Sequence, residues 1–335
     1  MITLMNHPRR LDAIYLMKLK TIFTCLCLAL LLVTGCRPGT TGTQSSTESG
    51  LTMVATTGQI NSALVKLTSG TGANIRLFCG PGVDPHSFSA STDDVQSMLD
   101  ADLIIYNGFH LEARLDEHLK GTFAEKSWSM ASAFPQEKRL DWVEDGEVDP
   151  SAPFDPHIWN HLPAWSECVS KLALRLAKAD PENAETYQQN AKAYLAEINE
   201  AHEWAAKMLS QLPVENRTIV SAHDAFNYFA KVYEMKTLAV LGIGNDPEAD
   251  IKTMRSVAQT ICDEKIPAIF IESITNPKVS KALQEACVSR NWAVKLVDQP
   301  LYSDDIGETD PQNTFLGAFK SNVQIIFSAL NQEGT

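Results

Sequence analysis

Residues 181–212 contain no glycine and, after Pro181, no further proline, which favours one unusually long helix. Asp180 is a residue type that caps helices, and Pro181 fits the first helical position. About 31 helical residues would span roughly 46 Å. Apolar side chains recur alternately four and three residues apart, at Tyr187, Ala191, Tyr194, Ile198, Ala201, Ala205, Met208 and Leu212. This spacing predicts one continuous buried stripe.

Strand and helix patterns alternate on both sides of this helix. The predicted strands are 51–57, 74–80 and 101–108 before it, and 217–223, 237–244, 267–273 and 293–299 after it. Helices are expected from about Gln59 and near Thr92, and later near 224–234, 250–264 and 277–290. The pattern predicts an α/β fold of two lobes, each with a mainly parallel sheet flanked by helices, joined by the long helix. A coiled-coil partner helix would give the same apolar spacing, but the flanking α/β units favour a helix laid along both lobes.

The beginning of the chain resembles a bacterial export signal. Residues 17–36 read MKLKTIFTCLCLALLLVTGC, with a basic start, an apolar run and a small-residue cleavage site before Cys36. We therefore expect a signal peptide over 1–35, lipidation at Cys36 and a flexible tether over 36–50. An ordinary secretory peptide is the alternative. The expected location is periplasmic or at the cell surface, with lobes at 51–180 and 213–335 and the joining helix at 181–212.

The charge of the chain is strongly acidic. Removal of residues 1–35 takes four of 28 basic residues and one of 41 acidic residues, so 24 and 40 remain and the net charge is −16. Such a surface repels phosphate backbones and anionic lipid, and attracts cations over long range. Nucleic acid is therefore not an expected partner.

Four cysteines would remain in the exported part beyond Cys36: Cys79, Cys168, Cys262 and Cys287. None has zinc-finger spacing. Cys262 and Cys287 fall on consecutive predicted helices, where they could form a disulfide or stay as two free thiols.

Two similar turns place a histidine after Asp-Pro: GVDPHSFSAS contains His86 and DPHIWNH contains His157. Imidazole is the commonest metal ligand in proteins, so matching turns suggest metal ligation. The alternative is that each histidine only caps a helix or fills a turn.

The positions of four residues relative to the predicted strands support a shared site. His86 and His223 follow strands, Asp304 follows the last strand, and His157 leads into a helix beginning near Pro163. Ligands of parallel sheets bind beyond the carboxyl ends of the strands, so all four side chains could meet in one interlobe cleft. Three imidazoles and one carboxylate suit zinc, manganese or ferrous iron better than calcium or magnesium.

Several motifs together resemble one family: DPHSFSAS, NGFHLEARLD, DPHIWNH, SAHDAFNYFAKVYEM, IFIES and LYSDDIGE. The chain is similar to the cluster 9 or TroA-like metal receptors of bacterial ABC transporters over nearly all of its exported part. The resemblance implies two α/β lobes on a long backbone helix and one metal ion between them. It implies the ligands His86, His157, His223 and Asp304.

Four neighbouring residues are further candidates. His161 lies four residues after His157, but Pro163 suggests that the helix starts later, so His161 is expected at the surface or behind a ligand. Asp305 is the rival of Asp304, because it stands where the family commonly has a small residue. His110 and Glu272 are expected to orient ligands or to line the cleft.

The choice of metal stays open between zinc and manganese. Many zinc receptors of the family carry a histidine-rich loop between the first two ligands, and the corresponding stretch here, FPQEKRLDWVEDGEVDPSAPFD, contains no histidine. Streptococcal manganese receptors resemble a pattern with glutamate at the place of His223, and this chain keeps histidine.

The sequence therefore predicts a lipid-anchored, monomeric receptor outside the cytoplasm that captures one divalent metal ion and passes it to a permease driven by a cytoplasmic ATPase. It is not expected to be an enzyme. A secreted metallohydrolase is the alternative from another class, although the chain has no HExxH motif and no nucleophile elbow. A surface adhesin on the same fold and a receptor for an organic metal chelate are further alternatives.

Overall fold

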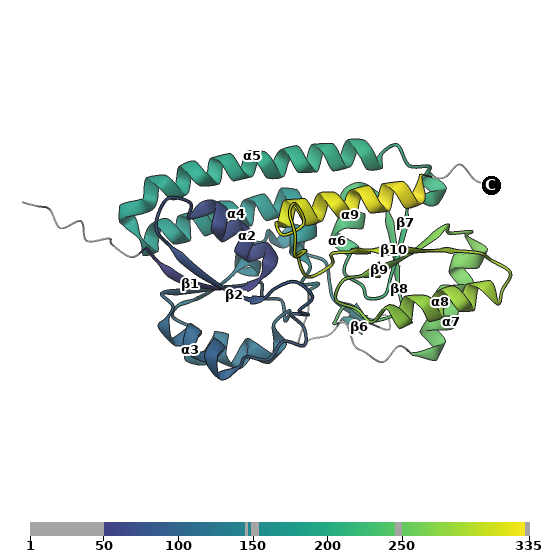
Figure 1. Ribbon diagram of the computed structural model, residues 1–335, viewed down its shortest axis with the longest axis horizontal. Helices are drawn as coiled ribbons and strands as arrows, with labels where there is room; N and C mark the ends of the chain where they lie inside the picture. The colour runs from purple at the N-terminus through teal and green to yellow at the C-terminus, as the bar shows by residue number, and fades with distance from the viewer. Residues whose placement is uncertain (1–49, 145–146, 149–153, 245–249, 332–335) are drawn as a thin grey trace, which may run out of the picture. The chain divides into compact units, whose positions relative to one another are not determined.

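A computed structural model describes residues 50–144, 147–148, 154–244 and 250–331 (Figure 1). The predicted signal peptide, Cys36 and all of the tether up to residue 49 lie outside the described residues. In the part that is described, no helix is both long enough and apolar enough to cross a membrane.

The N-terminal lobe is built on a parallel sheet with the strand order β2-β1-β3-β4. The strands are β1 (Thr52–Thr57), β2 (Asn74–Cys79), β3 (Leu103–Tyr106) and β4 (Ser127–Ser129). Successive side chains of β1 and β3 point to opposite faces, so Met53 packs with α2 (Gly58–Leu67) and Val54 with α3 (Thr92–Asp100). Thr57 caps α2, and a capping box of Ser91 and Asp94 starts α3.

The C-terminal lobe contains two parallel strand pairs. Strand β7 (Thr218–Ser221) pairs with β8 (Lys236–Ala239), and β9 (Ala268–Glu272) pairs with β10 (Lys295–Leu301). Strand β7 also lies beside β9. The helices are α6 (Asn227–Tyr233), α7 (Ile251–Asp263), α8 (Pro277–Val288) and α9 (Phe315–Leu330). The predicted fold class of two helix-flanked parallel lobes is confirmed.

Smaller elements connect these units. Strands β5 (Val143–Glu144) and β6 (Glu147–Val148) form an antiparallel pair. Single helical turns occur at Ala113–Leu115, His118–Thr122, Met130–Ala133, Gln136–Lys138, Ile158–Asn160, Pro181–Asn183 and Val214–Asn216. The sequence patterns predicted none of the three short strands β4, β5 and β6.

The predicted long helix is confirmed, with ends that differ from the sequence prediction. Helix α5 covers Ala184–Leu209, and the first predicted residues form a separate 3₁₀ turn, Pro181–Asn183. The apolar stripe is buried from Tyr187 to Ala205 as expected. At its end Leu209 is buried and Met208 is only half-buried, because 3.6 residues per turn bring the next position round to the covered face.

Helix α5 contacts elements of both lobes (Figure 1). It packs against α2 and against α4 (Leu162–Ala179) on the N-terminal side, and against α6 and α9 on the C-terminal side. Its stripe joins one hydrophobic core that contains strand residues of both lobes, among them Ile105 and Phe270. This shared core fixes how the two lobes sit on the helix.

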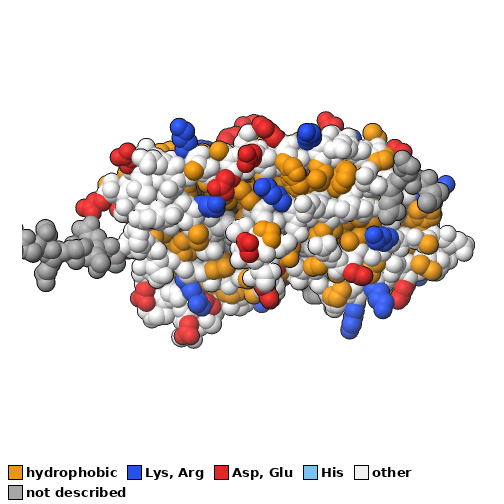
Figure 2. All heavy atoms as spheres, turned by 45° about the horizontal axis from the view of Figure 1, so that its top comes forward, with side chains coloured by type: hydrophobic (Ala, Val, Ile, Leu, Met, Phe, Trp, Pro, Cys, Tyr) orange, Lys and Arg blue, Asp and Glu red, His pale blue; other side chains and the backbone are white. Residues whose placement is uncertain are grey.

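The surface on the α5 side shows acidic and basic side chains interspersed with hydrophobic ones (Figure 2). Exposed large apolar side chains such as Val65, Leu174 and Val214 belong to separate elements. Single exposed apolar residues of this kind are normal for a globular protein.

All four cysteines of the described residues are free thiols. The Sγ atom of Cys262 lies 3.9 Å from the carbonyl oxygen of Cys287. The Sγ atom of Cys287 lies 3.8 Å from the carbonyl oxygen of Ala258. Of the two alternatives for Cys262 and Cys287, the structure has the free thiols, packed between α7 and α8.

We expect Ile198→Ala to lower the free energy of unfolding by about 2–5 kcal/mol, because Ile198 is fully buried in the stripe of α5. The matched control Glu200→Ala, on the exposed side of the same helix, should change it by no more than about 0.5 kcal/mol. Denaturant unfolding followed by circular dichroism measures both. Equal effects would contradict the packing of this stripe.

Candidate metal centre

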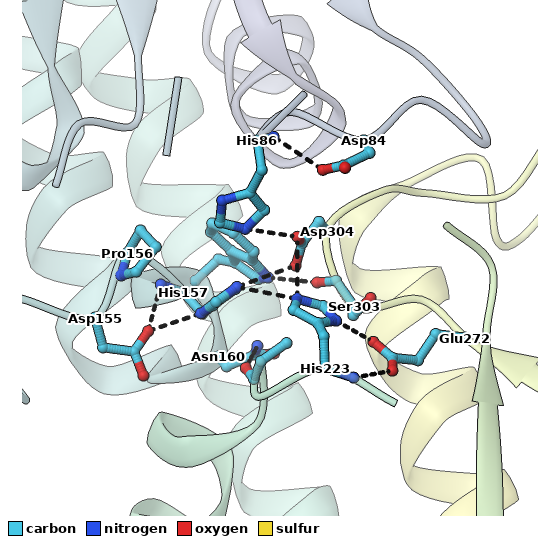
Figure 3. A network of polar contacts seen from close by, with 12 residues as sticks. Asp84, His86, Asp155, Pro156, His157, Asn160, His223, Glu272, Ser303 and Asp304 are labelled. Carbon is cyan, nitrogen blue, oxygen red and sulfur yellow. Dashed lines mark hydrogen bonds and ion pairs between the residues drawn. The ribbon is translucent and has the colours of Figure 1, made fainter. Parts of the chain in front are cut away.

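Four predicted ligands converge between the two lobes: His86, His157, His223 and Asp304 (Figure 3). One ligand atom from each lies within 4.8 Å of those of all the others. The Nε2 atoms of His86, His223 and His157 lie 3.2, 3.3 and 3.4 Å from the nearer Asp304 carboxylate oxygen. The His157, His223 and Asp304 side chains are fully buried, and that of His86 is 6% exposed.

Each of these residues stands near the end of a regular element. His223 comes two residues after β7, and Asp304 comes three residues after β10. His86 lies in the loop from β2 to α3, and His157 immediately precedes the turn Ile158–Asn160 that leads to α4. The carboxyl ends of the parallel strands thus bring three of the four side chains to the space between the lobes.

The two Asp-Pro-His turns have the same local structure. The backbone N–H of His86 donates to the Asp84 carboxylate at 2.9 Å, and that of His157 donates to the Asp155 carboxylate at the same distance. Such side-chain bonds to the backbone two residues on form Asx turns. The repeated motif therefore folds the chain so that a histidine is presented from a tight turn.

Two carboxylates lie behind the histidine rings and determine their orientation. Asp155 contacts Nδ1 of His157 at 2.7 Å, and Glu272 contacts Nδ1 of His223 at 2.5 Å. Glu272 also accepts hydrogen bonds from the backbone N–H groups of Ala222 and His223. When Nδ1 carries the donated proton, Nε2 presents its lone pair to the centre of the cluster.

Asp155 was not among the residues that the sequence singled out. The only signal was its place in the second Asp-Pro-His motif, which indicated a turn and not a contact with the ring. Glu272 lies behind His223, where it orients the imidazole.

The other candidates lie apart from the four. The His161 ring accepts a hydrogen bond from the Ala164 N–H at 3.2 Å and caps α4. His110 has the positive φ of 67°, and its ring lies against Asp116 and Trp142. Neither of these partners is one of the four residues of the cluster.

The carboxylate of Asp305 is directed to other partners than the cluster. It accepts hydrogen bonds from the Ser273 hydroxyl at 2.5 Å and from the Gly82 N–H at 2.7 Å. Burial raises the pKa of Asp305 to about 6, although both hydrogen bonds favour the ionised form. Of the two adjacent aspartates, the structure aims Asp304 at the three histidines.

Three polar atoms of the cluster are buried without a hydrogen-bond partner: Nε2 of His86 and both carboxylate oxygens of Asp304. Their contacts with one another and with the other two rings are the Nε2–carboxylate ion pairs of 3.2–3.4 Å given above, which form only when the imidazoles carry a proton. Buried polar atoms in proteins are almost always paired, so unpaired ones that point at a common centre indicate a ligand. Nitrogen and oxygen lone pairs that converge in this way fit a metal cation.

The negative charge of the carboxylates favours protonated His157 and His223 when no metal is bound. Burial opposes the charged form of His157, but the carboxylates of Asp304 and Asp155 outweigh it and raise its pKa to about 9. Burial likewise opposes ionisation of His223, yet Glu272 and Asp304 raise its pKa well above the usual value. For His86 burial dominates and lowers the pKa. Burial raises the pKa of Asp304, and the charges of His223 and His157 reverse this and lower it well below its usual range.

The carboxylates also supply charge for a dication. Asp304 alone would leave one positive charge of a bound dication uncompensated, but Asp155 and Glu272 stand one imidazole away from the centre. Hydrogen bonds from the rings to these carboxylates make the imidazoles stronger donors. The surroundings of the cluster therefore suit a divalent metal ion.

Comparison with known proteins agrees with this architecture. The family model of ZnuA, the zinc-uptake complex component A periplasmic, matches residues 53–329, and the chain belongs to this family. The manganese-binding lipoprotein MntA of Bacillus subtilis is 31% identical over 311 residues, which cover 92% of this chain and 98% of that protein. The zinc-binding protein TroA of Treponema pallidum is 32% identical over 312 residues, covering 91% and 97% of the two chains.

A solved structure and a more distant relative extend the comparison. The structure of the periplasmic zinc binding protein TroA from Treponema pallidum has a TM-score of 0.79 and 31% identity, covering 84% of this chain and 100% of that one. The manganese ABC transporter substrate-binding lipoprotein PsaA of Streptococcus pneumoniae is 25% identical, covering 94% of this chain and 100% of that protein. The resemblance inferred from the sequence motifs is thus confirmed.

We expect Glu272→Gln and Asp155→Asn each to weaken zinc binding by about 10- to 100-fold, because outer carboxylates orient ligand imidazoles and strengthen them as donors. Isothermal titration with zinc measures the affinity. Glu185→Gln, on α5, is the control and should leave the affinity unchanged. Unchanged affinity in both cluster variants would contradict the role of these carboxylates.

We also expect zinc binding at pH 7.5 to release protons. His157 and His223 have raised pKa values in the metal-free protein, and a protonated imidazole must lose its proton before Nε2 can bind a metal. The raised values stabilise the metal-free fold fully below about pH 6.5, the unperturbed value, and this contribution is lost as pH rises through about 9. Zinc affinity should therefore rise between pH 7 and pH 9.

Calorimetric titrations in buffers of different ionisation enthalpy count the released protons. A binding heat that is independent of the buffer at pH 7.5 would show that both imidazoles are already neutral.

Proposed function

We propose that the protein is an extracytoplasmic solute-binding protein that captures one divalent transition metal ion, zinc or manganese, and delivers it to an ABC transporter permease. The observation that carries the proposal is the buried cluster of three imidazoles and one carboxylate, with unpaired atoms directed at one centre between the lobes. In this proposal His86, His157, His223 and Asp304 are the ligands, and the ion is the cargo.

The donor set supports zinc or manganese. Imidazole nitrogen with one carboxylate is a mixed shell that transition metals accept, whereas calcium and magnesium prefer oxygen donors. The relatives described above at 31% and 32% identity are named for manganese and for zinc. A site with three neutral nitrogen donors favours zinc in affinity, following the general order of divalent metals.

The number and burial of the donors support a receptor over a metallohydrolase. Catalytic zinc sites hold the metal with three protein ligands and keep a fourth position open for water or substrate. Here four protein donors converge, and three of their side chains have no exposed surface. Four protein donors would surround a bound ion as cargo, which favours capture and delivery over activation of a water molecule.

The partners and the anchor belong to the same proposal. The relative named as an ABC transporter substrate-binding lipoprotein supports a membrane permease with a cytoplasmic ATPase as partner. We propose that Cys36 carries the lipid after removal of residues 1–35, and that 36–50 tether a monomer to the membrane. The N-terminal lobe (51–180), the joining helix (181–212) and the C-terminal lobe (213–335) then form the metal-binding body.

We expect the protein, purified from its native host without chelators, to contain one equivalent of zinc or manganese by elemental analysis. Alanine at His86, His157, His223 or Asp304 should weaken zinc binding by at least about 100-fold, since each removes a ligand. His161→Ala is the matched control and should bind zinc as the natural protein does, because its ring caps α4. A folded His157→Ala variant with natural affinity would refute the ligand set.

A further inference from the structure

A short segment of the C-terminal lobe, residues 303–307, is held by the N-terminal half of the chain. The Trp159 indole N–H donates to the carbonyl oxygen of Ser303 at 3.0 Å, and the Gln59 side chain donates to that of Asp305 at 3.4 Å. Ile306 lies so close to Gly58 that a Cβ atom at Gly58 would come within 2.7 Å of its side chain. The backbone that carries Asp304 is therefore positioned by both halves of the molecule.

The carboxylate of Asp305 joins the two lobes directly. One of its oxygens accepts the N–H of Gly82 from the loop after β2, and the other accepts the hydroxyl of Ser273, just after β9. Asp305 is 3% exposed, so its charge depends on these donors. Hydrogen bonds to an ionised carboxylate are stronger than those between neutral groups.

The partners of this carboxylate are close in sequence to the metal-binding cluster. Gly82 precedes His86 by four residues in the same loop. Ser273 follows Glu272, which holds the ring of His223, and Asp305 itself follows Asp304. One side chain thus ties together the loops that present two of the proposed ligands, His86 and Asp304, and the end of β9, which carries Glu272.

Release of a metal ion from this cluster requires one of its ligands to move away. His86 is the only ligand with any exposed side-chain surface, so its loop is the one nearest to solvent. The bond from Gly82 to Asp305 holds that loop against the segment that carries Asp304. Movement of the His86 loop away from the cluster would break this bond.

We propose that Asp305 is a positioning residue that clasps the two lobes across the cluster and slows the departure of the bound metal ion. This inference rests on the proposed function, because it assumes that the cluster binds a metal. The clasp lies outside the ligand set and acts through the loops of His86 and Asp304.

The test compares zinc dissociation from the natural protein with Asp305→Ala and Asp305→Asn. Zinc-loaded protein is mixed with excess chelator in a stopped-flow instrument, and the association rate is measured separately. Asparagine can accept from Gly82 and donate to the Ser273 oxygen, so it keeps the clasp, whereas alanine removes it. We expect Asp305→Ala to release zinc about 10- to 100-fold faster with association changed less than about threefold, and Asp305→Asn to restore most of the slow release.

Asp180→Ala is the control for a general loss of stability. Its carboxylate accepts hydrogen bonds from Tyr187 and Asn183 at the junction of α4 and α5, away from the cluster. It should release zinc at the natural rate, even where it lowers the unfolding temperature.

Three results would overturn the clasp: natural release from Asp305→Ala, release from Asp305→Asn as fast as from alanine, or loss of all zinc binding in Asp305→Ala, which would make Asp305 a ligand. Failure of the natural protein to bind zinc or manganese would instead refute the proposed function.

Discussion

The buried stripe of α5 is the contact on which the rest of the structure depends. This helix packs against both lobes, and its side chains from Tyr187 to Leu209 lie in a core shared with strands of both lobes. Alanine at 191, 201 and 205 lets neighbouring elements approach the helix closely, while Tyr187, Tyr194 and Ile198 fill the space between them. Because an α-helix is rigid over this length, the distance between the lobes is set by packing.

A fixed distance between the lobes allows the proposed ligands from separate loops to meet. The cluster draws one side chain from each of four segments, and their ligand atoms come within 4.8 Å of one another. Sites that bind ions need such precision, and loops achieve it only when a rigid scaffold and surrounding hydrogen bonds hold them. Here Asp155, Glu272 and Asp305 supply those bonds from directly behind the ligand loops.

The buried carboxylates of the cluster carry negative charge that protons or a metal cation can balance. Three buried carboxylates, Asp155, Glu272 and Asp304, face three buried imidazoles, and protons partly balance the negative charge in the metal-free protein. A divalent ion can replace these protons at the Nε2 atoms, so metal binding and proton release are linked.

The sequence by itself determined the main helices and strands and the order of the proposed ligands along the chain. Apolar periodicity predicted the parallel strands and the long helix, and the rule that ligands follow strand ends brought His86, His223 and Asp304 into one site. These inferences depend on local spacing, which the sequence records directly. The prediction placed Met208 in the buried stripe, whereas the structure buries Leu209. The alternating spacing of four and three residues averages 3.5 per turn and drifts from the helical period of 3.6.

Only the tertiary structure decided which contacts the polar side chains around the proposed ligands make. Asp155 could be read as a turn residue, but its bond to the His157 ring depends on how the turn packs against the lobes. Glu272 reaches His223 across 49 residues, and Asp305 reaches Gly82 across 223. The choice between two adjacent aspartates is a matter of side-chain direction at the end of a strand. That direction is set by contacts between distant segments, which no local pattern of residues contains.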